Sequence, residues 1–227
     1  MNFSPTPRQQ EIIQNFRSDR YDTLNRLRWD LFLKMGIPIK DQVIFEPGAG
    51  IGDQTEWLLA QGAKRVFVSD GRAENADIIF RRFGYDPRVS IWIGDLENPN
   101  FLEVARKGAP SDLIFLWGCY YHINDDLQEF RIMRALSKIA PVVAFDYLES
   151  QEDGTTFYGY QNNSTSISEY AIRPTTPTMI AGLKKAWGHA YLPKKQMDWE
   201  DPLAAGTPRR LAVASLEPLN NPNLIEQ

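Results

Sequence analysis

The stretch that decides the fold is Val43–Asp53, which reads VIFEPGAGIGD. Its first three residues are apolar and predict a short buried strand, and the three glycines after them predict a tight turn into a helix. At such a turn the backbone can approach a ligand closely, and the first turn of the helix directs unpaired N–H groups at that ligand. This arrangement is typical of nucleotide-binding sites in α/β proteins.

The spacing of the glycines distinguishes a dinucleotide-binding site from other nucleotide-binding sites. The dinucleotide fingerprint is G-x-G-x-x-G, whereas this loop reads G-x-G-x-G and has Asp53 where the third glycine would stand. Glu46 lies just before the loop, where a carboxylate opposes a pyrophosphate but attracts an ammonium or sulfonium group. The loop therefore disfavours NAD and favours a ligand with a positive charge.

Two further acidic residues follow the next two expected strands. Asp70 ends the first of these strands, at the position where an acidic residue accepts hydrogen bonds from ribose hydroxyls. Asp95 follows the second strand and can accept from the exocyclic amine of adenine, although it can also cap a helix. Since the carboxyl ends of parallel strands meet at one edge of a sheet, Glu46, Asp70 and Asp95 are predicted to line one rim.

Outward from the glycine loop, short apolar strands alternate with segments of helical periodicity. The expected strands are 43–45, 65–69, 89–93, 113–117, 142–145, 189–192 and 211–215. The expected helices are one or two within 8–35, and then 55–61, 74–83, 101–107, 127–136 and 178–187. Strands that alternate with helices predict parallel pairing, right-handed crossovers and a sheet covered on both faces, here closed by an antiparallel strand.

The chain resembles the class I S-adenosylmethionine-dependent methyltransferases. Four motifs in the correct order carry the resemblance: Glu46–Gly52, Val68–Asp70, Gly94–Leu96 and Asp112–Gly118. The resemblance implies an α/β fold with a Rossmann-like, doubly wound, seven-stranded sheet of order 3-2-1-4-5-7-6, its last strand antiparallel, preceded by N-terminal helices. It also implies S-adenosylmethionine as cofactor and S-adenosylhomocysteine as product. The residues that it implies for cofactor binding are Glu46, Gly48, Ala49, Gly50, Gly52, Asp70, Gly71, Arg72, Asp95, Leu96 and Gly118.

The segment after the fourth expected strand, Gly118–Asn124, is the predicted site of methyl transfer. His122 is a candidate general base, because an unperturbed imidazole titrates near ~6.5, but it can equally be a structural histidine that caps the next helix. Tyr121 is a candidate for proton donation to the acceptor and Tyr120 for shaping its pocket, against core packing of at least one of them. Cys119 is interpreted as a small buried apolar residue, because the chemistry needs no nucleophile.

The acceptor is predicted to bind under the polar, aromatic segment 149–178. Tyr158 and Tyr160 can line an aromatic pocket or pack the segment onto the body. Arg173 can recognise a carboxylate or phosphate of the acceptor, or can clasp a loop. No metal site is predicted, because Gly118 stands where the metal-assisted members carry an acid, and Asp146 with His122 is too small a ligand set.

Composition and charge limit the alternatives. The 227 residues carry 25 basic and 29 acidic side chains, for a net charge of −4, which disfavours a nucleic-acid substrate. A single cysteine points to a cytoplasmic protein, and no apolar run approaches the ~18 residues that span a membrane. The arginines at 17, 20, 26 and 28 are interpreted as a solvated helix face.

The sequence therefore predicts a helical cap (1–36), a methyltransferase domain (37–217) and a disordered tail (218–227). The favoured function is transfer of a methyl group to an oxygen or nitrogen of a small or medium-sized metabolite. A tRNA-modifying methyltransferase, a NAD-linked oxidoreductase and a non-catalytic nucleotide-binding domain remain the alternatives. The quaternary state, monomer or homodimer, stays open.

Overall fold

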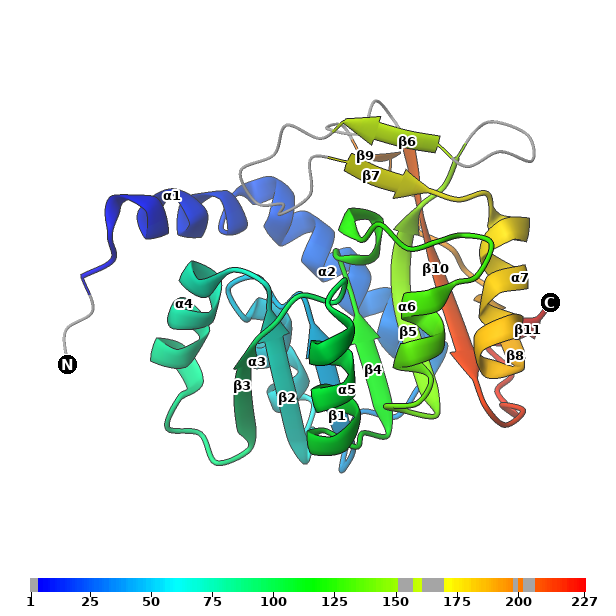
Figure 1. The fold of residues 1–227 in the computed structure, drawn as a ribbon, viewed down its shortest axis with the longest axis horizontal. Coiled ribbons are helices and arrows are strands. Elements are labelled where there is room, and N and C mark those ends of the chain that lie inside the picture. The colour runs from blue at the N-terminus through cyan, green and yellow to red at the C-terminus, as the bar shows by residue number, and fades with distance from the viewer. Residues whose placement is uncertain (1–3, 151–156, 161–169, 198–199, 202–206) are drawn as a thin grey trace.

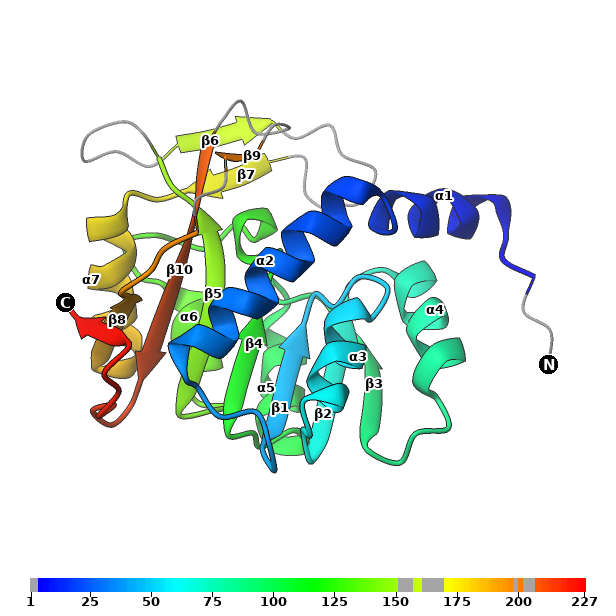
Figure 2. The ribbon, with the colours of Figure 1, turned by 180° about the vertical axis from the view of Figure 1, so that it is seen from behind.

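The computed structural model describes residues 4–150, 157–160, 170–197, 200–201 and 207–227, and shows a central sheet between two layers of helices (Figures 1 and 2). From one edge to the other, the strands of the sheet are β11 (Leu224–Glu226), β8 (His189–Pro193), β10 (Thr207–Ser215), β5 (Val142–Leu148), β4 (Leu113–Leu116), β1 (Val43–Pro47), β2 (Arg65–Asp70) and β3 (Val89–Ile93). A short strand, β9 (Glu200–Asp201), pairs with β10.

Strands β1 to β5 are mutually parallel, and β10 runs antiparallel to both β5 and β8. With β8 as the sixth strand and β10 as the seventh, the order is 3-2-1-4-5-7-6, as predicted. Strand β1 therefore lies between β2 and β4, at the point where the strand order reverses. This is the crevice where α/β sheets bind their ligands.

The prediction of a disordered tail at 218–227 is wrong. Residues 224–226 form β11, which pairs antiparallel with β8 and extends the sheet by one strand. Leu224 is buried, and Asn221 Nδ2 donates a hydrogen bond to the carbonyl of Met35 at 2.8 Å. The unpaired backbone groups of the edge strand β8 give this polar, proline-containing segment a partner that its composition does not reveal.

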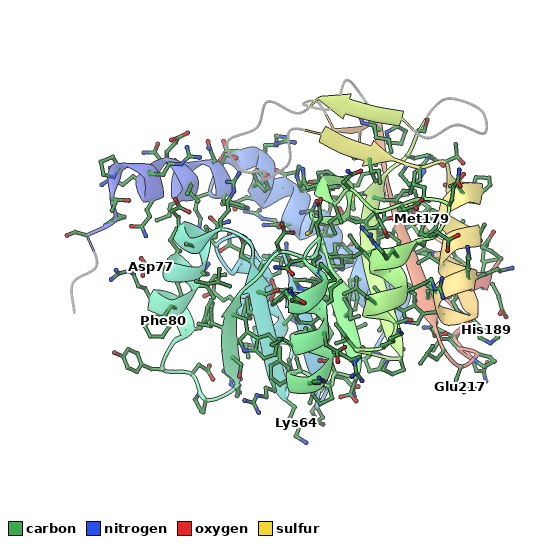
Figure 3. The ribbon with its side chains drawn as sticks, viewed as in Figure 1. Lys64, Asp77, Phe80, Met179, His189 and Glu217 are labelled. Atoms are coloured by element: carbon green, nitrogen blue, oxygen red, sulfur yellow. The ribbon has the colours of Figure 1, made fainter. Side chains whose placement is uncertain are left out.

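Each face of the sheet carries its own helices. Helices α5 (Pro99–Gly108), α6 (Arg131–Leu136) and α7 (Thr176–Trp187) pack on one face, where Met179 is fully buried (Figures 1 and 3). Helices α2 (Asp19–Met35), α3 (Asp53–Ala60) and α4 (Ala73–Phe83) contribute to the core on the other face (Figure 2). The two layers leave the carboxyl ends of β1 to β5 to be covered by other segments.

Helix α1 (Pro7–Phe16) lies at the β3 side of that edge, where it packs against α4 (Figure 2). It begins with a capping box, in which the Thr6 side chain accepts from the backbone N–H of Gln9 and the Gln9 side chain accepts from that of Thr6. Its apolar side is separate from the two main cores, because Ile12 packs only in a small cluster with Ile51 and Ile78. A modest apolar contact therefore holds α1 over the glycine loop.

The segment 149–178 contains more regular structure than a loop. Strands β6 (Phe157–Tyr160) and β7 (Tyr170–Arg173) pair antiparallel beyond the carboxyl end of β5 (Figure 1). Residues 151–156 and 161–169 lie outside the described part of the chain. None of the helices that the structure describes is long and apolar enough to cross a bilayer.

Candidate functional site

A cavity of about 290 Å³ lies at the carboxyl ends of β1 to β4, between the sheet edge and the helices α1 and α2. The predicted site residues in its wall are Gly48, Ala49, Gly50, Asp70, Gly71, Arg72, Asp95, Leu96, Gly118 and His122. The predicted residues that do not line it are Glu46, Gly52, Tyr120, Tyr121 and Arg173. The side chains of Tyr158 and Tyr160 lie outside the described part of the structure.

The glycine loop forms the floor of this cavity. Gly50 has a φ of +61°, and a Cβ atom there would lie 2.7 Å from the ring of Phe16 on α1. Gly48 has a φ of +69°, and a Cβ atom there would collide with Cys119. Only glycine tolerates both a positive φ and neighbouring atoms this close to the position of a Cβ atom. The loop therefore presents backbone without side chains to the cavity at Gly48 and Gly50.

Glu46 lies in β1, immediately below the loop, and is 2% exposed. The Thr55 hydroxyl donates to its Oε2 at 2.7 Å, while Oε1 accepts no hydrogen bond from any described residue. Burial raises the pKa of Glu46 to about 8, against the lowering effect of Thr55. A buried carboxylate oxygen that lacks a donor can accept from an ammonium group, although Glu46 itself lies below the glycine loop and not in the cavity wall.

Asp70 connects the end of β2 to the glycine loop. Its Oδ2 accepts from the backbone N–H of Gly50 at 2.9 Å, and its Oδ1 accepts from Arg72 N at 2.9 Å and Asn75 Nδ2 at 3.1 Å. Burial raises the pKa of this carboxyl, and the three hydrogen bonds oppose that shift. Because each carboxylate oxygen has about two lone-pair sites, Oδ2 keeps one that can accept from a ribose hydroxyl.

Asp95 follows β3 and is exposed at the cavity wall. Its Oδ1 accepts from the backbone N–H of Glu97 at 2.9 Å, which fixes a turn. The cap of α5 is Asn98, whose side chain accepts from Asn100 N, so Asp95 is not a helix cap. Its position at the rim, next to the buried Leu96, fits the predicted contact with a nucleobase.

The turn after β4 brings His122 to the cavity. Gly118 has a φ of +69°, and its N–H donates to Asp146 Oδ1 at 2.6 Å. A short 3₁₀ helix, η1 (Tyr120–His122), follows and places His122 half-buried in the cavity wall. Its imidazole lies 4.2 Å, between ring centroids, from the ring of Tyr121.

The two tyrosines of this turn point away from the cavity. Tyr120 is fully buried and packs against Phe145, with their ring centroids 5.5 Å apart. Tyr121 is buried beside Arg209, whose guanidinium carbon lies 4.8 Å from the ring centroid and whose Nη2 donates to the hydroxyl at 3.3 Å. Burial raises the pKa of Tyr121. Burial also raises the pKa of the Cys119 thiol, which keeps it neutral.

Arg173 lies at the end of β7, where its Nη1 donates to the Thr207 hydroxyl at 3.0 Å. This contact joins the β6–β7 pair to β10. It corresponds to the second interpretation from the sequence, in which Arg173 holds a loop in place. Its role in binding the acceptor stays a prediction.

The sequence interpretation missed a buried ion cluster. Asp146 Oδ2 accepts from Arg28 Nη2 at 2.8 Å and from Arg209 Nη1 at 2.6 Å, and all three side chains are at most 3% exposed. The expectation that Arg28 belongs to a solvated face is therefore wrong. Its guanidinium passes beside Gly118, where a Cβ atom would lie 3.1 Å from Nη2, and enters the cavity wall.

Several further residues complete the cavity wall. They are Phe16, Tyr21, Asn25, Ile51, Asp53, Gln54, Asn75, Gly94, Glu97, Trp117 and Ile123. Tyr21, Asn25 and Arg28 are spaced by four and three residues, so they share one face of α2. That polar stripe was readable in the sequence, but nothing local showed that it faces inward. Among the described residues, no group of three His, Cys, Asp or Glu is placed to hold a metal ion.

Among the comparisons with known proteins, only the comparison with solved structures finds matches. No family model matches this chain, and no curated protein matches it by sequence. A solved structure of the N-terminal domain of EvdMO1, in the presence of S-adenosylhomocysteine and D-fucose, matches with a TM-score of 0.64 and 17% identity, covering 87% of this chain and 84% of that one.

Two further solved structures extend the likeness. The 1,6-didemethyltoxoflavin-N1-methyltransferase of Burkholderia thailandensis matches with a TM-score of 0.58 and 18% identity, over 95% of this chain and 92% of that one. The magnesium protoporphyrin IX methyltransferase of Synechocystis PCC 6803 matches with a TM-score of 0.56 and 14% identity, over 94% of this chain and 87% of that one. The chain therefore has the class I S-adenosylmethionine-dependent methyltransferase fold.

Proposed function

We propose that this protein is a methyltransferase that uses S-adenosylmethionine. The observation that carries the proposal is Glu46, whose buried Oε1 lacks a donor beneath a glycine loop that offers bare backbone. In this assignment Glu46 holds the ammonium group of the cofactor, Asp70 accepts from its ribose and Asp95 lies at its adenine. The backbone of Gly48–Gly50, with Gly71, Arg72, Leu96 and Gly118, surrounds it.

We further propose a small or medium-sized metabolite as the acceptor. The net charge of −4 provides no overall attraction to a polynucleotide. The three proteins with similar structures described above were solved with, or are named for, small molecules: D-fucose, 1,6-didemethyltoxoflavin and magnesium protoporphyrin IX. The β6–β7 pair, which ends at Arg173, lies at the same end of the sheet, and the segment 149–178 is the proposed cover of the acceptor.

The cofactor supplies an electrophilic methyl group on a sulfonium, and a lone pair of the acceptor displaces the thioether in line. The chain has to align the acceptor and take up its proton. His122 is the proposed base, because it is the imidazole in the cavity wall, at the carboxyl end of β4. Tyr121 lies behind this ring rather than in the cavity, so we assign it the positioning of His122.

Calorimetric titration with S-adenosylmethionine, S-adenosylhomocysteine and NAD tests the cofactor. We expect micromolar binding of the first two and none of NAD. Asp70→Ala should abolish binding, because it removes the ribose acceptor and the anchor of Gly50. Asp86→Ala, a half-buried acid whose side chain bonds only within its own turn, is the matched control. Binding of NAD, or of none of the three, would overturn the proposal.

Once an acceptor is found by screening for S-adenosylhomocysteine release, His122→Ala tests the base. Loss of a general base lowers kcat by about 10²–10⁴. The affinity for S-adenosylhomocysteine should stay within about twofold, because a base for the acceptor makes no contact that the cofactor needs. A variant with unchanged kcat would exclude His122 as the base.

A further inference from the structure

A chain of hydrogen bonds joins α2 to α3 at one end of the cavity. The indole Nε1 of Trp29 donates to Gln54 Oε1, and Gln54 Nε2 donates to Asn25 Oδ1 at 2.8 Å. Arg28 Nη1 also donates to Asn25 Oδ1, at 3.3 Å. Asn25 and Gln54 both line the cavity, and Gln54 is the second residue of the helix that follows the glycine loop.

This chain of bonds fixes the orientation of the Asn25 amide. An indole N–H can only donate, so the oxygen of Gln54 faces Trp29 and its nitrogen faces Asn25. A guanidinium can also only donate, so two donors converge on Asn25 Oδ1. The Asn25 nitrogen must therefore point away from Gln54 and Arg28. If the amide were flipped, its N–H groups would face Gln54 Nε2 and Arg28 Nη1, which are themselves donors.

The Asn25 nitrogen has no acceptor among the described residues, although the side chain is only 5% exposed. This nitrogen is not among the unpartnered atoms that are fully buried, so water can hydrate it in the ligand-free protein, and a bound ligand can supply an acceptor in place of that water. Because Asn25 lines the cavity, that acceptor belongs to whatever binds there.

The charge near Asn25 selects an anionic acceptor. Arg28, Arg209 and Asp146 together carry two positive charges and one negative charge, all buried. Arg28 uses three of its guanidinium N–H groups in hydrogen bonds to Asp146 and Asn25, out of the five that a guanidinium has. Of the acids in the cavity wall, Asp70 ends β2, Asp95 lies two residues beyond β3, and Asp53 is paired with Arg82 at 2.7 Å. A carboxylate is thus the group that fits beside Asn25 and Arg28.

The adjacent residue ties this subsite to Glu46. Gln54 bonds Asn25, and the next residue, Thr55, bonds Glu46. The proposed ammonium site and the carboxylate site are thus joined through consecutive residues of α3. The ammonium and carboxylate groups of an amino acid share one carbon atom, so they need neighbouring partners of this kind.

We propose that Asn25, oriented by Trp29 and Gln54 and supported by Arg28, binds the α-carboxylate of the methionine moiety of the cofactor. The inference rests on the proposed function and adds the residues that read the amino-acid end of the ligand. Asn25 and Arg28 are binding residues in this assignment, and Trp29 and Gln54 are positioning residues.

Two ligands separate this inference from the function on which it rests. S-adenosylhomocysteine has the amino-acid group, and 5′-methylthioadenosine has the same thioether nucleoside without it. We expect Asn25→Asp, which keeps an oxygen for both donors but replaces the amide nitrogen with a negative oxygen, to weaken S-adenosylhomocysteine about 10- to 100-fold. Binding of 5′-methylthioadenosine should change less than about threefold, because that ligand has no group at this subsite.

A second variant tests the orientation without touching the ligand. Trp29→Phe keeps an aromatic ring next to Trp57 but removes the indole N–H, so the Gln54 amide loses its fixed direction. S-adenosylhomocysteine should weaken by about three- to tenfold, and 5′-methylthioadenosine should not. Asn100→Asp, exposed on α5, controls for the added charge and should change neither affinity.

The carboxylate subsite is tested by calorimetric affinities of both ligands for the unmodified protein and the three variants. Equal weakening of both ligands in Asn25→Asp, or of neither, would overturn the carboxylate subsite while the methyltransferase proposal stands. Failure of the unmodified protein to bind either ligand would overturn both. Melting curves without ligand confirm that each variant is folded. If Asn25→Asp does not fold, Trp29→Phe still allows the affinities for S-adenosylhomocysteine and 5′-methylthioadenosine to be compared.

Discussion

Arg28 Nη2 on α2 lies 2.8 Å from Asp146 Oδ2 on β5, and the two side chains are only 3% and 0% exposed. The same carboxylate oxygen also accepts from Arg209 on β10, and the other oxygen accepts from the Gly118 N–H after β4. One carboxylate therefore connects the N-terminal helices, the turn that carries His122 and the antiparallel strand. The position of Arg28 in the cavity wall depends on this connection.

Replacement of Asp146 by asparagine should destabilise the fold strongly. The change leaves two buried guanidinium groups without their counter-charge, and removing one partner of a buried ion pair costs about 3–5 kcal/mol. Urea denaturation at pH 7 measures the loss. Asp30→Asn, which disrupts the exposed pair of Asp30 with Lys34, is the control and should leave the midpoint unchanged. A loss as small as that of the control would contradict a structural role for the cluster.

Glu46→Gln should stabilise the ligand-free protein at alkaline pH. The pKa of Glu46 is raised from 4.5 to about 8 in the fold, so between these values the unfolded chain ionises this group while the folded chain keeps its proton. The stability that depends on Glu46 is present below pH 4.5 and falls as the pH rises through about 8. Glutamine does not titrate, so the variant should gain over the unmodified protein by up to about 5 kcal/mol at pH 8.5, with little difference at pH 5.

Urea denaturation at pH 5, 7 and 8.5 checks this prediction. Glu56→Gln, on the exposed surface of α3, is the matched control and should show no such trend. If the difference between Glu46→Gln and the unmodified protein stays constant with pH, Glu46 is ionised in the ligand-free fold and the raised pKa is wrong.

Cofactor binding should release a proton from Glu46. An ammonium group at the unpartnered Oε1 favours the ionised carboxylate, so a group that is protonated at pH 7 before binding loses its proton on binding. Calorimetric titration of S-adenosylhomocysteine in two buffers of different ionisation enthalpy counts the protons. We expect a release approaching one proton at pH 7, and none for Glu46→Gln, whose residual binding should be weaker. Equal release by both proteins would assign the proton to another group.

The motifs at the carboxyl ends of the strands were predictable because each is local in the sequence. Glu46, the glycines, Asp70 and Asp95 all follow recognisable strands, and the topology of a parallel sheet then brings them together. The strand order, which was implied by the resemblance that these motifs carry, was also correct. Among the expected strands and helices only the ends moved, as in β5, which continues to Leu148, whereas β6, β7, β9 and β11 were not expected.

The residues that could not be predicted depend on contacts distant in the sequence. Arg28 looks like a surface residue until Asp146 is placed beside it, 118 positions further along. Tyr120 and Tyr121 differ in their environments only through the partners that they meet, Phe145 and Arg209. The C-terminal tail was mistaken for disorder because the edge strand that orders it is also non-local. Composition contains none of this information.

Gly50→Ala should loosen α1 as well as the cofactor site. An alanine at a φ of +61° is strained by about 1–2 kcal/mol, and its Cβ would lie 2.7 Å from the ring of Phe16. Helix α1 is held by the small cluster around Ile12 and by Gln9, which donates at 2.7 Å to Asp77. Asp77 lies on α4 (Figure 3). Displacement of Phe16 should therefore release the helix locally.

Hydrogen exchange of the α1 amides measures that release, and we expect it to accelerate at least about tenfold in Gly50→Ala. Gly62→Ala is the matched control, because Gly62 has a φ of +89° but the atom nearest to its Cβ would be Cγ in the flexible side chain of Lys40, at 3.3 Å. Both variants should lose similar global stability, and only Gly50→Ala should lose affinity for S-adenosylhomocysteine. Equal exchange of α1 in the two variants would show that the Phe16 contact does not hold the helix over the glycine loop.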